Sequence, residues 1–136
     1  MRARFLVDRS AWARSDIAMV GDVLLPLLEG GAVATCSVVD LEILHSARSA
    51  ADYEEVVSEL AGLEHVPLSQ EVFDRALDIQ RRLAATGHHR VPIPDLLIAA
   101  AALEHDLAVL HYDADFEAIS SVTNLPHTSV AARGSV

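Results

Sequence analysis

The sequence predicts an α/β fold in which helices flank a parallel sheet of about four to five strands. Short apolar runs of strand character alternate along the chain with amphipathic helical segments, and this alternation is typical of a parallel sheet. At 136 residues the chain has the length of one compact domain, and no repeat, linker or low-complexity tract divides it. We therefore expect residues 1–136 to form a single domain.

The N-terminal segment predicts a strand followed by a helix. Residues 5–7 are apolar and end at Asp8, as expected of a short buried strand. Ser15 can cap a helix whose later apolar residues recur with the period of an α-helix. Pro26 should bend this helix near its end, and Gly30 should terminate it.

A second strand and two further helices are expected next. Residues 32–36 have strand character, and Ser37 is placed to cap the helix that follows. That helix carries Glu42 beside an apolar stripe of Val38, Leu41 and Leu44. The next helix has acidic residues on its solvent side and an apolar face of Tyr53, Val56, Val57 and Leu60.

The middle of the chain predicts a weak strand and two contrasting helices. Residues 65–67 form the strand, and Ser69 opens an amphipathic helix that Gly87 ends. The face of this helix that we expect to pack inward comprises Val72, Phe73, Ala76, Leu77, Gln80 and Leu83. Pro94 stands where the first residue of a helix would be, and the helix at 95–105 is apolar on nearly all sides, so it should be buried.

The C-terminal segment predicts a strand, a short helix and an edge strand. Residues 107–110 form the strand, with Asp113 just beyond its end. Asp115 can cap a short helix that runs through Ile119, and residues 128–131 have the character of an edge strand.

The charge of the chain excludes one class of function. It has 20 acidic residues against 10 basic residues, all of them arginine, and a formal net charge of −10. Proteins that bind nucleic acid through a basic surface gain affinity by neutralising phosphates, so this composition excludes a histone-like binder. It remains compatible with an enzyme whose acidic residues hold a divalent cation that meets the phosphate.

Cysteine usage and hydropathy favour a cytoplasmic location. Cys36 is the single cysteine, so no internal disulfide can form and a reducing compartment is expected. The longest apolar run, residues 96–103, is too short to span a bilayer, and residues 1–8 lack the apolar core of a signal peptide. We therefore expect no membrane association.

Four acidic residues lie at positions that call for a functional explanation. Asp8 and Asp113 each follow the carboxyl end of an expected parallel strand, where α/β proteins bind ligands. Asp95 lies in the first turn of the buried helix, and Glu42 lies on an apolar helical face. Carboxylates that converge at one edge repel one another unless a cation holds them, and Mg²⁺ and Mn²⁺ prefer such oxygen ligands.

Each acid also has a purely structural interpretation. Asp95 can complement the dipole of its helix, and Asp8 can form an Asx turn. Asp113 and Asp115 can serve as turn and cap residues. Glu42 is the acid that such roles explain least, because a solvated glutamate does not need an apolar face.

Four blocks of the sequence resemble the signature blocks of PIN-domain ribonucleases. They are VDRS at residues 7–10, DLE at 40–42, IPDLLIAA at 93–100 and HYDADF at 111–116. The third and fourth blocks are the most specific. Length and spacing are similar to those of the VapC toxins of bacterial toxin–antitoxin pairs, and the resemblance covers essentially the whole chain.

The resemblance implies a Mg²⁺-dependent endoribonuclease, with Mn²⁺ able to substitute. Its catalytic and metal-binding residues would be Asp8, Glu42, Asp95 and Asp113, with Asp115 as a weaker metal ligand. In this interpretation Asp8 and Asp95 hold the principal ion, and a water activated by the metal hydrolyses the RNA phosphodiester bond without a side-chain nucleophile.

Two positions depart from the pattern of the family. Arg9 stands where threonine or alanine is common, and His111 stands where threonine is frequent, whereas Ser10 keeps the hydroxyl of the first block. These departures concern the hydrogen bonds around the ligands and leave the acidic ligands complete.

An acidic chain must hold RNA through a local set of side chains. The candidates for RNA binding are Arg9, Ser10, Arg14 and Arg90, whereas Arg81 and Arg82 fit a solvated helix face better. The resemblance also implies a homodimer and a VapB-like antitoxin whose tail covers the groove. Exposed apolar positions of the helices at 53–60 and 72–83 are candidate contact surfaces.

Two alternatives from other classes remain open. A catalytically inactive PIN-like module would keep the fold only to bind a partner. A receiver-type signalling domain would share the acidic, Mg²⁺-binding rim, although such domains use a lysine there and this chain has none. The sequence offers no closed zinc-ligand spacing, no base for Cys36 as a nucleophile and no glycine-rich loop for a nucleotide cofactor.

Overall fold

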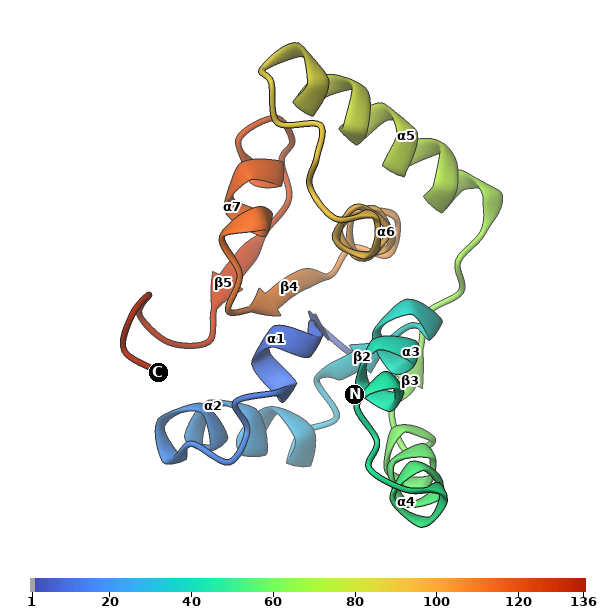
Figure 1. Ribbon diagram of the computed structural model, residues 1–136, viewed down its shortest axis with the longest axis vertical. Helices are drawn as coiled ribbons and strands as arrows, with labels where there is room; N and C mark the ends of the chain where they lie inside the picture. Colours follow the sequence, from blue (N-terminus) through green and yellow to red (C-terminus); the bar gives the residue numbers. More distant parts are fainter. Residues whose placement is uncertain (1) are drawn as a thin grey trace.

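The computed structural model describes residues 2–136, and its centre is a parallel sheet of five strands in the order β3-β2-β1-β4-β5 (Figure 1). The strands are β1 (Phe5–Val7), β2 (Val33–Thr35), β3 (Glu64–His65), β4 (Ala108–His111) and β5 (His127–Ser129). All four neighbouring pairs are parallel. The predicted fold class is therefore confirmed. Because β2 lies on one side of β1 and β4 on the other, strand order reverses between β1 and β4.

Helices cover both faces of this sheet. They are α1 (Arg9–Trp12), α2 (Ala18–Glu29), α3 (Ser37–His45), α4 (Ala50–Leu60), α5 (Gln70–Ala85), α6 (Ile93–Glu104) and α7 (Ala114–Ser120). Figure 1 shows α5, α6 and α7 above the sheet and α1 and α2 below it, with the C-terminal end near α2. In residues 2–136, no helix combines the length and the apolar character required to cross a membrane.

The alternation of side chains along the strands divides the core into two parts. Leu6 and Val109 point to the side of α5, α6 and α7, where they are fully buried. Their neighbours Val7 and Leu110 point to the opposite side and pack with α1 and α2. Both faces of the central strands are therefore apolar, as a parallel sheet between two helical layers requires.

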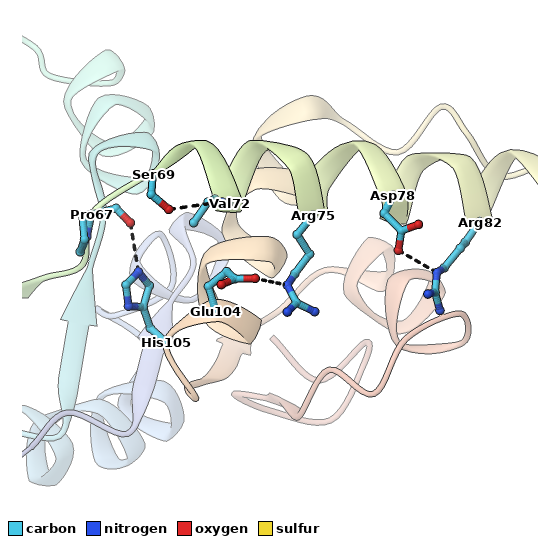
Figure 2. A network of polar contacts seen from close by, with 8 residues as sticks. All are labelled: Pro67, Ser69, Val72, Arg75, Asp78, Arg82, Glu104 and His105. Carbon is cyan, nitrogen blue, oxygen red and sulfur yellow. Dashed lines mark hydrogen bonds and ion pairs between the residues drawn. The ribbon is translucent and has the colours of Figure 1, made fainter.

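The helix α6 is the central support of one layer. Its residues from Ile98 to Ala102 are fully buried, which confirms the expectation from its apolar sequence. Figure 2 shows how polar contacts at the edge of this layer hold the neighbouring α5: Arg75 donates to Glu104 of α6 at 2.6 Å. At the other end of the same network, the Ser69 side chain caps α5 and the imidazole of His105 lies 3.1 Å from the Pro67 carbonyl oxygen (Figure 2).

Several helix starts differ from the sequence prediction. The short helix α1 was not predicted, and it forms because the Asp8 carboxylate caps it directly after β1. Ser15 does not cap α2, which begins at Ala18 after Ile17 and has no side-chain cap. Ser37 is the first residue of α3 and does not cap it. A hydroxyl close to a helix start is compatible with several cap positions, and the fold selects among them.

Three helices also present other faces than predicted. In α4 the predicted apolar face is buried only at Leu60, whereas Tyr53 and Val57 are 41% and 36% exposed. In α3 the predicted stripe is wrong, because Leu41 is 65% exposed while Val39 is fully buried. In α5 the buried stripe includes Ile79, whereas Phe73 and Leu77 are 43% and 61% exposed. The strands β3, β4 and β5 are displaced by one or two residues from their predicted bounds, and α6 begins at Ile93, two residues early.

Candidate metal-binding and catalytic site

The predicted acids gather at the carboxyl ends of β1 and β4. Val7 and Leu110 are register partners in these strands, so Asp8 follows β1 directly beside the end of β4. The backbone N–H of Asp8 donates to the Leu110 carbonyl at 2.9 Å, which fixes this junction. Asp113 lies two residues beyond the end of β4. This is the place where strand order reverses, which is the usual ligand site of an open α/β sheet.

The two carboxylate oxygens of Asp8 differ: one forms hydrogen bonds within the protein, and the other forms none with the described residues. Its Oδ2 accepts from the Ser10 backbone N–H at 2.9 Å and from the Ser10 hydroxyl at 2.6 Å. The expected Asx turn is therefore present. The other oxygen, Oδ1, is buried and has no hydrogen-bond partner in the described chain. A buried carboxylate oxygen without a partner is costly, so the structural role alone does not account for Asp8.

Asp95 enters the cluster from the first turn of α6 and is 6% exposed. Its Oδ2 is buried and has no hydrogen-bond partner within residues 2–136. Burial raises the pKa of Asp95 to about 8, and the nearby charges of Asp8 and Asp113 add to the rise. Without a cation Asp95 therefore holds a proton at neutral pH, whereas a bound cation would favour its ionised form.

Glu42 reaches the cluster from α3, and its neighbour Asp40 provides a direct contrast. Both oxygens of Asp40 are occupied, one by the Thr35 hydroxyl at 2.6 Å and the other by the His65 imidazole at 2.9 Å. The Oε1 of Glu42 is buried without a partner in the described residues. Burial raises the pKa of Glu42, Asp8 and Asp113 add to the rise, and Arg9 opposes it.

Asp113 and Asp115 complete the cluster at the start of α7. The sequence prediction of Asp115 as the cap is wrong: Asp113 caps α7, and its Oδ1 accepts from the Asp115 backbone N–H at 2.9 Å. This turn brings the Asp115 side chain back towards Asp95. Burial and the charge of Asp113 raise the pKa of Asp115.

The geometry of the carboxylates fits a divalent cation. One oxygen each from Asp95, Asp113 and Asp115 lie within 4.8 Å of one another. A hard cation at about 2.0–2.6 Å from each ligand can bridge oxygens at such separations. The tightest group thus contains Asp115, the residue with the weakest support from sequence, whereas Asp8 and Glu42 lie outside this group and act on its members through their charges.

Ser10 couples the two strand ends that carry the acids. Its hydroxyl donates to Asp8, and it accepts from the backbone N–H of Tyr112 at 2.9 Å. Ser10 is 8% exposed, so its hydroxyl is engaged inside the protein. Ser10 therefore orients Asp8. A contact between its hydroxyl and RNA stays a prediction.

The arginines predicted to bind RNA are placed differently from one another. Arg9 is exposed on α1 and lines a cavity of about 470 Å³ together with Glu42. Arg14 follows α1 and donates to the Ser10 carbonyl at 2.9 Å. Arg90 is exposed in the turn before α6. Arg82 pairs with Asp78 of its own helix at 2.9 Å, as a residue on a solvated helix face would.

His111 supports Asp113 through the backbone. The Asp113 N–H donates to His111 Nδ1 at 3.0 Å, so this nitrogen must be the acceptor and the ring proton lies on Nε2. His111 Nε2 lies 2.9 Å from His127 Nδ1 and donates to it in this tautomer. Burial, with the charges of His127 and Arg133 adding to it, lowers the pKa of His111 to about 4. His111 is therefore a neutral acceptor at pH 7.

Sequence reasoning did not single out His127. No periodic pattern links it to His111, and the contact arises only because β5 pairs with β4. Cys36, the remaining candidate nucleophile, is fully buried, and burial raises the pKa of its thiol. Such a thiol is unreactive at neutral pH.

Comparison with known proteins agrees with this architecture. The family model of the PIN domain matches residues 6–122, and the chain therefore belongs to the PIN-domain family. Ribonuclease VapC51 of Mycobacterium tuberculosis (strain ATCC 25618 / H37Rv) is 40% identical over 136 residues, which cover 100% of this chain and 99% of that protein. Ribonuclease VapC21 of the same species (strain CDC 1551 / Oshkosh) is 43% identical, with 98% and 99% covered. Within the PIN-domain family the chain is thus a member of the VapC ribonucleases.

Solved structures show the same fold. The VapBC-5 toxin–antitoxin structure from Mycobacterium tuberculosis matches with a TM-score of 0.67 at 26% identity and covers 93% of this chain and 98% of the other. VapBC2 from Rickettsia felis matches with a TM-score of 0.77, covering 95% of this chain and 98% of the other. At 16% identity the second match is a likeness of fold alone.

The raised pKa of Asp95 predicts how stability depends on pH without metal. The folded protein keeps this proton up to about pH 8, whereas the unfolded chain loses it near the ordinary pKa of 3.8. The free energy of unfolding in EDTA should therefore fall as pH rises through this range. Asp95→Asn should flatten the dependence and raise the free energy of unfolding at pH 8 by on the order of 2 kcal/mol. Urea titrations at several pH values measure both effects.

Asp22→Asn is the matched control, since Asp22 is exposed on α2 and should leave the pH profile unchanged. A lower stability of Asp95→Asn than of the wild type at pH 8 in EDTA would contradict the prediction and favour a helix-dipole role for Asp95.

The hydrogen bond from the Asp113 N–H to His111 predicts that His111→Asn and His111→Gln will differ in metal affinity. In His111→Asn the amide oxygen can take the place of Nδ1 and accept from the Asp113 N–H. In His111→Gln the amide lies nearer the position of Nε2 and leaves that N–H without its acceptor. We expect about tenfold weaker Mn²⁺ binding for His111→Gln and near wild-type binding for His111→Asn, measured by calorimetry. Equal affinities in the two variants, with comparable thermal stability, would show that this hydrogen bond does not position Asp113.

Proposed function

We propose that this protein is the toxin of a type II toxin–antitoxin pair and acts in the cytoplasm as a single PIN-like domain of residues 1–136. Its activity in this proposal is hydrolysis of RNA phosphodiester bonds by a divalent-metal-dependent endoribonuclease. One observation carries the proposal: three buried carboxylate oxygens, from Asp8, Glu42 and Asp95, lack partners in the described chain at the reversal of strand order. Relatives named as ribonucleases along the whole chain support the choice of RNA as the substrate.

The donor set supports a hard divalent cation, and we propose Mg²⁺, with Mn²⁺ as a substitute. Asp95, Asp113 and Asp115 would hold it, while Asp8 and Glu42 would add negative charge around it. When bound, such a cation lowers the pKa of a water molecule and offsets negative charge on the phosphate, so no side-chain nucleophile is needed.

The residues of the chain itself keep the carboxylates in place. Ser10 orients Asp8, so that Oδ2 is held and Oδ1 is available. The Asp115 N–H holds one oxygen of Asp113, and His111 holds its backbone. Arg9 offsets part of the charge near Glu42. Carboxylates fixed in this way reduce the reorganisation that the reaction would otherwise require.

Two apolar surfaces support the proposed partners. One is a groove of about 340 Å³ between α5 and α6, lined by Phe73, Leu77, Ile93, Leu97 and their neighbours. Ile93 is 66% exposed and Leu77 is 61% exposed. We propose that a second copy of this chain covers this surface, because its lining carries no charge and two chains of net charge −10 associate best through uncharged surfaces.

The second surface suits a VapB-like antitoxin. It is a groove of about 410 Å³ lined by residues of α1 to α4, among them Trp12, Leu28, Val56 and Glu59. Most of the side chains that line the groove are apolar, which suits the apolar face of a bound segment. The net charge of −10 favours a basic partner segment.

Metal-dependent cleavage tests the proposed activity. Purified protein should cleave a pool of structured RNA in Mg²⁺ or Mn²⁺ and should fail to do so in EDTA. Asp95→Asn and Asp8→Asn should each lower the cleavage rate by about 10²-fold or more, because each removes charge from the cluster. Gel analysis of end-labelled RNA measures both effects.

Asp22→Asn is again the control, since it removes one exposed carboxylate on α2 without touching the cluster. Cleavage by Asp95→Asn at the wild-type rate would contradict the proposed site. Failure of the folded wild-type protein to cleave any RNA in the pool would favour the alternative of an inactive PIN-like binding module.

A charged substitution tests the proposed dimer surface. The wild-type protein should be a dimer in light scattering, and Leu77→Glu should convert it to a monomer, because the carboxylate would be desolvated at the interface. Leu25→Glu is matched in chemistry and exposure, since Leu25 is 59% exposed on α2, and it should remain dimeric. A Leu77→Glu dimer, or a wild-type monomer at high concentration, would contradict this assignment.

A further inference from the structure

Tyr112 brings together two arginines from opposite ends of the chain. The Cζ atom of Arg14, which follows α1, lies 4.4 Å from the centroid of the Tyr112 ring. The Cζ atom of Arg133, which follows β5, lies 5.3 Å from the same centroid. Both guanidinium groups therefore lie over one ring, which keeps their positive charges close together. Neither arginine forms an ion pair with a carboxylate within the described part of the chain.

The ring and both arginines are held by further contacts. The Tyr112 hydroxyl accepts from the Gly134 N–H at 2.6 Å and donates to the Ala132 carbonyl at 3.4 Å, which binds the segment around Arg133 to the ring. On the other side, Arg14 donates to the Ser10 carbonyl at 2.9 Å. Each cation–π contact stabilises the arrangement, although the two like charges repel. A phosphate bound by either guanidinium group would offset part of this repulsion.

The arginine pair lies at the edge of the acidic cluster. Tyr112 precedes Asp113 in the chain, and its N–H donates to the Ser10 hydroxyl that orients Asp8. The Tyr112 ring and its two arginines therefore lie next to the carboxyl end of β4, where Asp113 joins the acidic cluster.

We propose that Arg14 and Arg133, held by Tyr112, bind phosphate groups of the RNA strand next to the one that is cleaved. This inference rests on the proposed ribonuclease function and adds a residue, Arg133, that sequence analysis did not identify as a ligand of RNA. The guanidinium group is planar and forms paired hydrogen bonds with phosphate oxygens. Tyr112 is only 9% exposed, so it orders the arginines and does not stack on a base.

The proposal explains how a chain with net charge −10 can hold RNA. Binding does not need a broad basic surface if two cations are fixed in advance at one side of the site. Each guanidinium that neutralises a phosphate contributes to the salt dependence of binding, with a slope of about −0.7 per contact for a single strand.

The test uses the full chain in two formats. Binding of a fluorescent single-stranded RNA is measured by anisotropy at several salt concentrations, with Asp95→Asn in every protein to prevent cleavage. Arg14→Gln and Arg133→Gln should each weaken binding about three- to tenfold, and each should reduce the magnitude of the salt slope by about 0.7. In proteins with Asp95 intact, the same changes should raise KM with little change in kcat.

Matched variants separate this role from a structural one. Arg48→Gln removes one exposed arginine before α4 and should leave binding and KM unchanged. Arg133→Lys should restore part of the affinity because it keeps the charge. The increase in thermal stability on adding Mn²⁺ should be equal in wild type and Arg133→Gln, since the acids are intact.

The outcomes distinguish this inference from the proposed function. If the wild type cleaves RNA but Arg14→Gln and Arg133→Gln bind RNA with unchanged affinity, the proposed role of the two arginines is wrong. The proposed ribonuclease activity would be unaffected by that result. If the wild type shows no metal-dependent cleavage, the proposed ribonuclease function itself is wrong. If the two variants bind RNA normally but lose binding to poly-glutamate, the pair recognises an acidic peptide and the RNA assignment is wrong.

Discussion

The burial of several carboxylates close to one another is the constraint on which the arrangement of this protein depends. Asp8, Glu42 and Asp95 each have a buried oxygen without a partner in the described chain, and Asp113 and Asp115 lie beside them. Burial raises the pKa values of Asp95, Glu42 and Asp115, and the charges of neighbouring carboxylates add to the rise; both effects express the cost of this arrangement without a cation. A fold that brings these groups together at such a cost must hold them with stable apolar packing elsewhere.

The scaffold supplies that packing through the sheet and α6. The strands β1 and β4 are buried on both faces, and α6 places Asp95 at its first turn while its later residues are buried among α5, α7 and the sheet. Hydrogen bonds then orient the acids. Ser10 donates to Asp8, and the Asp115 N–H donates to the Asp113 side chain. His111 accepts from the backbone N–H of Asp113. The apolar core thus provides stability, and short polar contacts provide direction.

The same region concentrates opposite charges within a small space. Arg9 lies near Glu42, and Arg14 and Arg133 meet on Tyr112 beside Asp113. The chain has 20 acidic and 10 basic residues, so for binding a substrate with phosphates the local arrangement of charges matters more than the net charge. A substrate that carries phosphates requires both signs: carboxylates that can hold a cation, and guanidinium groups that meet the remaining negative charge.

The placement of the acids was largely predictable because their positions follow local rules. An apolar run of strand character ends at Asp8, and another ends just before Asp113, so the parallel sheet brings both acids to one edge. Asp95 follows a proline at a helix start, which places it in the first turn. The grouping of the acids was not predictable: Asp115 lies close to Asp95 and Asp113 only because Asp113 caps α7 and turns the chain back.

The amino-acid sequence by itself determined the alternation of strands and helices, the buried character of α6 and the set of acids at the strand ends. These follow from periodicity and apolar content, which act over a few residues. Tertiary structure decided which oxygens are left without partners, which faces of α3 and α5 are exposed, and which residues meet across the sheet. The contacts of His127 with His111 and of Arg133 with Tyr112 join segments far apart in the chain. Such contacts depend on strand order and packing, and no local pattern in the sequence encodes them.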